Sequence, residues 1–406
     1  MAGIYVHVPF CKSRCLYCDF FSTTRLPQRD AFVRALLTEI RLRATSPFAP
    51  SYATVYFGGG TPSLLSAEQL LQLTDALRRY YPIEPDAEWT IEANPDDLSP
   101  QFCRDLIHAG FNRLSIGTQS FCDKELQFVH RRHNAEQAQN AFCNAREAGF
   151  ANIGLDLIYA LPLQTDSSWR QSVDKTIRLR PEHISAYALT YEPGSPLTRL
   201  CRRGKIEKQP EEAELNAYQY LTDALKQAGY RHYEVSNFAL PGYQSRHNSA
   251  YWRRIPYLGF GPSACFFHPH YPSPAPERSD TALPSRQPSP ESTLQSAVDT
   301  PSDYAQIRWQ NAPDLDLYLS EIDAGRLPVA TCETLSPQEV YEEKVMLGLR
   351  TDEGIPLASL NPDETDRLLA VAEPYVQNGL LRLSEQKLIA SDRGLLLIDR
   401  IIPNLF

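Results

Sequence analysis

The chain has 406 residues, of which 42% are hydrophobic and 22% charged, and its formal net charge is −9. This acidic balance disfavours nucleic-acid binding, which needs clustered Lys and Arg side chains, and no apolar run approaches the roughly 20 residues of a membrane-spanning helix. Because the first residues also lack the basic segment of a secretory signal, we expect a cytoplasmic protein that does not span a membrane.

In the first half of the chain, short β-rich runs alternate with amphipathic stretches. Apolar residues recur at helical spacing between the runs, for example Phe32, Leu36 and Ile40. Repeated βα units of this kind predict a parallel sheet, either open or curled towards a barrel. The predicted strands are residues 4–8, 53–57, 88–93, 113–118, 152–158 and 183–189.

Chemically distinctive residues stand at or just after the ends of five consecutive predicted strands. A cysteine cluster at 11–18 follows the first strand and the sequence GGGTP, 58–62, follows the second. Glu92, Gln119 and Asp156 lie near the ends of the third, fourth and fifth. In βα barrels the loops at the carboxyl ends of the strands converge and carry the chemistry. We therefore expect these residues to share one site.

Composition divides the chain into four regions. Residues 1–190 carry the βα units, and 191–267 extend them with a helical stretch at 210–229. Residues 268–302 contain eight prolines and seven serines, which is the composition of a linker. The remaining 303–406 show two helical patterns and then a hairpin-like segment, which predicts a small winged-helix-like α+β domain.

Three cysteines in the stretch CKSRCLYC, Cys11, Cys15 and Cys18, predict a metal centre. Thiolates bind soft metals, and a disulfide framework is not expected in a reducing compartment. One interpretation is a zinc ion held by the three thiolates and His7. The other is a 4Fe–4S cluster with three protein-bound irons and one iron open to an external ligand.

The spacing CxxxCxYC after a first strand resembles the signature of the radical S-adenosylmethionine (SAM) superfamily. This resemblance implies a partial (β/α)6 TIM-like barrel. It also implies a 4Fe–4S cluster on Cys11, Cys15 and Cys18, whose open iron binds the amino and carboxyl groups of SAM. In that superfamily, reduction of the cluster cleaves SAM to a 5′-deoxyadenosyl radical.

The same resemblance assigns the contacts to SAM. The GGTP motif, with Gly59, Gly60 and Thr61, would meet the methionine end of SAM through its backbone. Glu92 would accept hydrogen bonds from the ribose hydroxyls. Five further residues match SAM-contact or cluster-flanking positions of the family, and none is assigned a catalytic role: Gln119, Arg131, Asp156, Tyr5 and Tyr17.

Several segments, among them IYVHVPFC, IEANP and YEVSNFA, resemble the oxygen-independent coproporphyrinogen III oxidase group. The oxidase branch has a further cysteine two residues after the third cluster cysteine, where this chain has Phe20. The other branch, the HemW haem chaperones, has an HNxxYW motif, which this chain carries at 247–252. The resemblance therefore implies a protein that binds haem and delivers it to recipient proteins, among them respiratory enzymes.

Within this motif His247 is the candidate haem ligand, because a neutral imidazole is a common axial ligand of haem iron. Tyr251 and Trp252 supply flat apolar area for a porphyrin face. Cys265 stands where relatives often have His, and it is a second candidate iron ligand.

Two other functions are open at this point. One is oxidative decarboxylation of coproporphyrinogen III, against which Phe20 counts. The other is DNA binding by the winged-helix-like domain. Its second helix carries four acidic residues against Arg367, and an acidic helix is repelled by phosphates. A domain of this kind is better suited to docking a protein partner. The acidic residues are Asp363, Glu364, Asp366 and Glu373.

Overall fold

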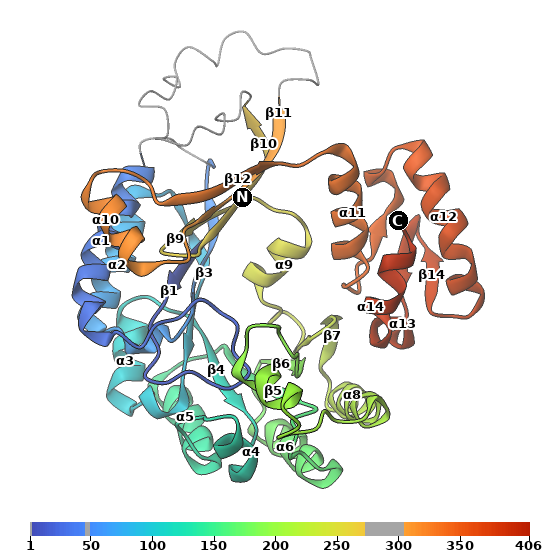
Figure 1. The fold of residues 1–406 in the computed structure, drawn as a ribbon, viewed down its shortest axis with the longest axis horizontal. Helices are drawn as coiled ribbons and strands as arrows, with labels where there is room; N and C mark the ends of the chain where they lie inside the picture. Colours follow the sequence, from blue (N-terminus) through green and yellow to red (C-terminus); the bar gives the residue numbers. More distant parts are fainter. Residues whose placement is uncertain (1, 45–48, 273–303) are drawn as a thin grey trace. The chain divides into compact units, whose positions relative to one another are not determined.

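The computed structural model describes residues 2–44, 49–272 and 304–406 (Figure 1). The chain divides into two compact units, each made of separate stretches of sequence. The first unit comprises 1–116, 140–151 and 254–335, and the second comprises 117–139, 152–253 and 336–406. Strand β4 (Arg113–Gln119) and helix α5 (Ala135–Ala148) each begin in one unit and end in the other.

The first unit is built on a sheet whose strands β1, β2, β3 and β4 are parallel neighbours in chain order. On the other side of β1 lies β9, also parallel, and then an antiparallel ribbon of β10, β11 and β12. The first four predicted strands are confirmed. The bounds are Ala2–Val8 for β1, Tyr52–Gly59 for β2, Ile83–Ala93 for β3, Tyr257–Phe260 for β9, Cys265–Pro272 for β10, Tyr304–Asn311 for β11 and Val329–Thr334 for β12.

Helices of the first unit cover this sheet with their apolar faces. In α1 the predicted stripe of Phe32, Leu36 and Ile40 is fully buried. Helix α2 begins at a capping box in which Ser66 and Gln69 satisfy each other's backbone N–H groups. Figure 1 shows α1, α2 and α10 beside one another, and α1 contacts both of the others. The bounds are Arg29–Arg43 for α1, Ala67–Tyr80 for α2, Pro100–His108 for α3 and Leu315–Asp323 for α10.

A fully buried carboxylate, Glu39 of α1, ties the first unit together. It accepts hydrogen bonds at 2.8–2.9 Å from Arg43, Asn311, the Gly261 amide and Tyr318. A buried charge is tolerated only when it is paired and its oxygens are satisfied, as they are here. These partners come from α1, β11, the turn after β9 and α10, so one side chain connects segments more than 200 residues apart.

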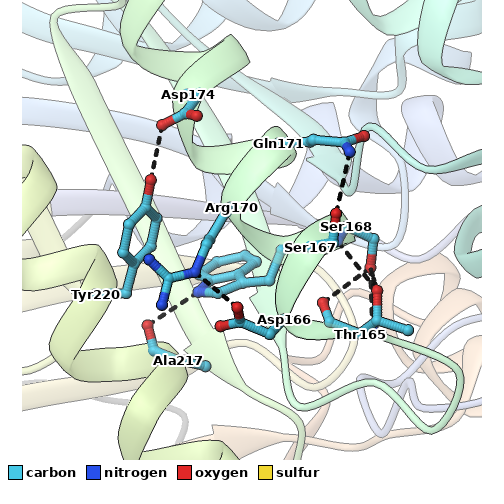
Figure 2. Close-up of polar contacts among 10 residues, drawn as sticks. Thr165, Asp166, Ser167, Ser168, Arg170, Gln171, Asp174, Ala217 and Tyr220 are labelled. Atoms are coloured by element: carbon cyan, nitrogen blue, oxygen red, sulfur yellow. Dashed lines mark hydrogen bonds and ion pairs between the residues drawn. The ribbon is translucent and has the colours of Figure 1, made fainter.

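In the second unit β5 and β6 are parallel neighbours, and β8 and β7 follow as antiparallel neighbours. Helices α6 and α8 pack on these strands around buried Trp169, whose indole N–H donates to the Ala217 carbonyl at 2.9 Å. Figure 2 shows Tyr220 of α8 pointing to Asp174 of α6, to which its hydroxyl donates at 2.8 Å. The predicted strands at 152–158 and 183–189 and the helix at 210–229 are confirmed. The bounds are Ile153–Tyr159 for β5, His183–Ala188 for β6, Arg231–Glu234 for β7, Asn237–Ala239 for β8, Asp123–Phe128 for α4, Asp166–Leu179 for α6, Pro196–Arg202 for α7, Glu211–Gln227 for α8 and Arg246–Trp252 for α9.

The C-terminal part of the second unit forms a small domain with its own three-stranded sheet, in the order β13, β15, β14. The hairpin turn places Glu385 and Gln386 at positive φ, which is the geometry of a type I′ turn. The segment after the hairpin, which the sequence pattern included in it, is helical. The bounds are Pro337–Gly348 for α11, Ile355–Pro356 for β13, Pro362–Gln377 for α12, Leu381–Ser384 for β14, Lys387–Ala390 for β15, Asp392–Leu396 for α13 and Ile398–Ile401 for α14.

The region predicted as C-terminal domain, 303–406, contributes to two different sheets. Strands β11 and β12 extend the sheet of the first unit, and only residues from 355 onwards build the small sheet. At the predicted linker, residues 268–272 form the end of β10, and 273–302 lie outside the described residues. The sequence pattern missed this because the pairing of β11 with β10 is a tertiary contact across the Pro/Ser-rich segment.

The small domain is joined to β7 by backbone hydrogen bonds. The Val235 amide donates to the Arg350 carbonyl, and the Asp352 amide donates to the Tyr233 carbonyl. Between them Glu234 is completely buried, and its Oε1 has no hydrogen-bond partner among the described residues. Burial raises the pKa of Glu234 from 4.5 to about 7, partly offset by hydrogen bonds and by Arg350. A proton is therefore bound at this junction near neutral pH.

We predict that Glu234→Gln changes how stability depends on pH. Folded protein keeps the Glu234 proton up to pH about 7, while the unfolded chain releases it near 4.5, so wild-type stability falls as pH rises through this window. Wild-type stability falls in this window and that of the variant does not, so the free energy of unfolding of the variant relative to wild type should rise by roughly 3 kcal/mol from pH 4.5 to pH 8. Urea unfolding of both proteins at several pH values measures this difference. A constant difference across the range would contradict the prediction.

Candidate functional site

The glycine run after β2 passes very close to the end of β1. Gly59 has φ +107°, and a Cβ there would come within 2.6 Å of the His7 ring. A Cβ on Gly60 would lie 2.7 Å from the Phe10 carbonyl oxygen. Glycine fits both positions because the His7 ring leaves no room for a side chain at Gly59 and the backbone of residues 8–10 leaves none at Gly60. The predicted cradle, Gly59 and Gly60, therefore lies against the segment that leads into the cysteine cluster.

Glu92 at the end of β3 is held against this cradle. Its Oε1 accepts a hydrogen bond from the Tyr56 hydroxyl at 2.7 Å, and its Oε2 accepts one from the Gly59 amide at 3.2 Å. Tyr56 stacks on Tyr5, its parallel-register neighbour on β1. Burial, and then the charge of Glu92, raise the pKa of Tyr5 well above its usual value. The first unit thus places Tyr5, Glu92 and the glycine run together.

The three cluster cysteines are partly exposed and lie on the segment that follows β1. The Cys11 amide donates to the Thr23 carbonyl at 2.9 Å, and the Cys11 thiol lies 3.6 Å from the Thr61 hydroxyl. A turn brings the Cys18 amide to the Cys15 carbonyl. Each thiolate of an iron–sulfur cluster binds a different iron, so the sulfurs need not converge on one point. The donor set therefore fits a cluster.

The alternative of a zinc ion with His7 as fourth ligand is disfavoured. His7 is buried, its Nε2 donates to the Phe21 carbonyl at 2.9 Å, and its Nδ1 accepts from the Tyr5 hydroxyl at 3.1 Å. Burial lowers the pKa of His7 to about 4, so the ring is neutral and both nitrogens are occupied. Among the described residues, no three His, Cys, Asp or Glu side chains are grouped to hold one metal ion.

The remaining predicted SAM contacts in the second unit occupy different kinds of position: Gln119 ends β4, Arg131 follows α4, and Asp156 lies in the middle of β5, not near its end as the sequence pattern predicted. Tyr17 is in the turn between Cys15 and Cys18. Gln119, the last residue of β4, has φ +67°, an uncommon conformation for a residue other than glycine. Arg131 donates to the Gly117 carbonyl at 2.5 Å. Asp156 is half-buried on β5, in register with Ser185 of β6.

The HNxxYW motif forms one short helix, α9, capped by Ser245. His247 is buried and its Nε2 is hydrogen-bonded to the Tyr251 hydroxyl at 2.9 Å, as expected for residues four apart on one helix face. Trp252 is partly exposed. For His247 to bind iron through Nε2, the Tyr251 hydroxyl has to leave that nitrogen.

Sequence reasoning missed the role of Tyr56 and the place of Cys265. Tyr56 stands opposite Tyr5 in the β1–β2 register, so strand alternation at these two positions was the available signal. Cys265 begins β10, and burial raises the pKa of its thiol. Phe20, next to the cluster loop, is 72% exposed.

Comparison with known proteins identifies the family. A family profile described as Radical SAM superfamily matches residues 5–176, and one described as HemN C-terminal domain matches 335–397. A protein of Mycobacterium tuberculosis named heme chaperone HemW is 34% identical over 99% of this chain and 94% of its own length. This chain belongs to the HemW family. A HemW of Bacillus subtilis is 32% identical over 99% of the chain and 98% of its own length.

Among solved structures, the Escherichia coli coproporphyrinogen III oxidase HemN matches with a TM-score of 0.77. It is 24% identical, and the match covers 100% of this chain and 89% of HemN. The likeness confirms the predicted fold, a radical SAM partial barrel with a small C-terminal α+β domain. Membership of the HemW family implies a 4Fe–4S cluster and SAM as cofactors. None of the described helices is long and apolar enough to cross a membrane.

We predict that Gly59→Ala destabilises this HemW-family chain more than Gly242→Ala does. Both glycines have positive φ, which costs alanine about 1 kcal/mol. Around Gly242 there is open space, whereas at Gly59 the new methyl group also meets the His7 ring, which adds roughly 1–3 kcal/mol. Thermal unfolding of both variants, without added cofactors, makes the comparison. Equal melting temperatures would show that the close approach of the His7 ring to Gly59 is absent in solution.

Proposed function

We propose that this protein is a haem chaperone that binds haem and delivers it to recipient proteins, among them respiratory enzymes, and that it carries a SAM-binding 4Fe–4S cluster. The observation that supports this most strongly is its similarity, over 99% of its length, to relatives named heme chaperone HemW. The cradle formed by Gly59, Gly60 and Glu92 beside the cysteine loop is what such a cofactor site requires.

Cys11, Cys15 and Cys18 would hold the cluster, and the fourth iron would take the amino and carboxyl groups of SAM. When bound and reduced, the cluster would supply the electron for cleavage of SAM. The chain's own residues would hold SAM. The backbone around Gly59 and Gly60 would accommodate its methionine end, and Glu92 would accept hydrogen bonds from the ribose hydroxyls after the Tyr56 hydroxyl has left Oε1. Buried, neutral His7 keeps the loop seated through its bond to Phe21. Gln119, Arg131, Asp156, Tyr5 and Tyr17 complete the proposed site.

Haem would bind in the second unit near α9. His247 is the proposed axial ligand, and Trp252, which is partly exposed, offers apolar area to the porphyrin. Tyr251 holds Nε2 of His247 until iron replaces it. Cys265 in the first unit is the competing candidate for the iron.

The rival function is oxidation of coproporphyrinogen III, for which the HemN likeness provides only a shared fold. At the position of the additional cysteine of the oxidase branch, this chain has exposed Phe20. Incubation of the reconstituted, reduced protein with SAM and either haem or coproporphyrinogen III separates the two functions. Stable haem binding without decarboxylation is expected, and formation of protoporphyrinogen would reject the chaperone assignment.

We predict that replacing Cys11, Cys15 or Cys18 by Ala removes most of the cluster. Each thiolate holds its own iron, so loss of one exposes a corner of the cluster to solvent. Iron and sulfide analysis after anaerobic reconstitution measures the loss. Cys143→Ala, another partly exposed thiol, is the matched control and should retain full iron and sulfide. If zinc remained in place of iron and sulfide in the wild type, the cluster assignment would be wrong.

We predict that His247→Ala weakens haem binding and shifts the haem absorbance spectrum, because the axial bond is lost. Tyr251→Phe should retain the wild-type spectrum and bind haem at least as tightly, since it removes the group that occupies Nε2. Haem titration of these variants beside Cys265→Ala gives the comparison. An unchanged affinity and spectrum for His247→Ala would reject this ligand. A changed spectrum for Cys265→Ala alone would transfer the role to that thiol.

A further inference from the structure

Glu125 of α4 is a buried carboxylate to which the proposed function assigns no role. It is 1% exposed, and it accepts three hydrogen bonds from neutral side chains of the second unit. Ser120 donates to Oε2 at 2.6 Å, Gln164 donates to Oε2 at 3.2 Å, and Ser168 donates to Oε1 at 2.5 Å. Burying a charge with only neutral donors is costly, so the arrangement needs an explanation beyond packing.

The first of these contacts fixes the loop that carries Gln119. The Ser120 hydroxyl that donates to Glu125 also accepts from the Cys122 amide at 3.0 Å, and the Phe121 amide donates to the Ser172 hydroxyl. Each residue from 120 to 122 therefore makes a hydrogen bond. These residues directly follow Gln119, whose backbone is strained at a φ of +67°. A strained conformation persists only where its surroundings over-determine it, and Glu125 anchors those surroundings.

The other two contacts fix the loop between β5 and α6. Gln164 donates to Glu125 and also to the Ile158 carbonyl, at 3.2 Å each, and Ser168 lies in the first turn of α6. Gln209 clamps the same loop from outside, donating to the carbonyls of Leu161 and Gln164 at 2.9 Å. One carboxylate therefore joins the loop after β4 to the loop after β5, the strand that carries Asp156.

We propose that Glu125 is a positioning residue for SAM: it locks the loops after β4 and β5 to one another so that Gln119 and Asp156 are presented together. The inference rests on the proposed function, in which these two residues contact SAM. Glu125 itself does not touch the ligand. It acts through Ser120 on one loop and through Gln164 and Ser168 on the other, and the cost of holding Gln119 at positive φ is met before SAM arrives.

The test uses full-length, cluster-reconstituted protein and measures SAM affinity by calorimetry and amide hydrogen exchange of residues 117–122. Glu125→Ala removes the acceptor that Ser120, Gln164 and Ser168 share and leaves the buried Ser120 hydroxyl without it, so we expect SAM to bind about tenfold more weakly and exchange in this segment to be faster. Glu125→Gln keeps one acceptor oxygen and should recover most of the affinity. Tyr230→Phe, which removes a buried hydrogen bond to the Pro181 carbonyl elsewhere in the same unit, is the control and should leave SAM affinity unchanged.

The outcomes separate this inference from the proposed SAM site. If Gln119→Ala weakens SAM binding while Glu125→Ala stays within twofold of wild type, the positioning role is rejected and the site stands. If Gln119→Ala has no effect, the site and the inference fail together. Should Glu125→Ala not fold, Ser120→Ala reports on the same contact, and unchanged SAM affinity and exchange in that variant would overturn the proposal. Equal weakening by Tyr230→Phe would also overturn it, since the effect would then be one of general stability.

Discussion

The close approach of the glycine run to the end of β1 is the constraint on which the candidate site depends. Two parallel strands bring their carboxyl ends to one edge, but the loops that follow can share a ligand only if their backbones nearly touch. Without side chains, Gly59 and Gly60 permit this contact with His7 and Phe10. Glu92 then reaches the Gly59 amide, and Thr61 reaches the Cys11 thiol. Each of these pairs would be separated if the backbones stood a side chain's width further apart.

In the second unit, residues of the candidate site are held in position by a different kind of contact. The end of strand β4 is held not by glycine but by polar side chains from the loop that follows α4. Arg131 and His133 donate to the carbonyls of Gly117 and Thr118, which fixes the end of β4 before the strained Gln119. Burial lowers the pKa of His133 to about 3, so this contact is made by a neutral ring and adds no further charge beside Arg131. Each bond is replaceable in isolation, whereas together they fix a single loop conformation.

Strand positions and strand-end residues were predictable because alternation and βα rhythm are local patterns, as for β1–β6 and the apolar stripe of α1. The three cysteines were recognisable for the same reason, since their spacing lies within eight residues. The features that the sequence did not reveal depend on contacts between residues far apart in the chain. The pairing of β11 with β10 and the stacking of Tyr56 on Tyr5 follow from register, not from composition. The contact of His247 with Tyr251 could have been read from their helical spacing, but burial of the ring could not.

The Glu39 network also constrains when this protein can finish folding during its synthesis. Glu39 lies in the first helix, but two of its four partners, Asn311 and Tyr318, are made roughly three-quarters of the way through translation. Until they emerge from the ribosome, the carboxylate is buried without enough donors or stays in water, and α1 cannot settle against the sheet. At typical elongation rates this wait is on the order of tens of seconds. The cysteine loop directly before α1 therefore has no settled helix beside it throughout this interval.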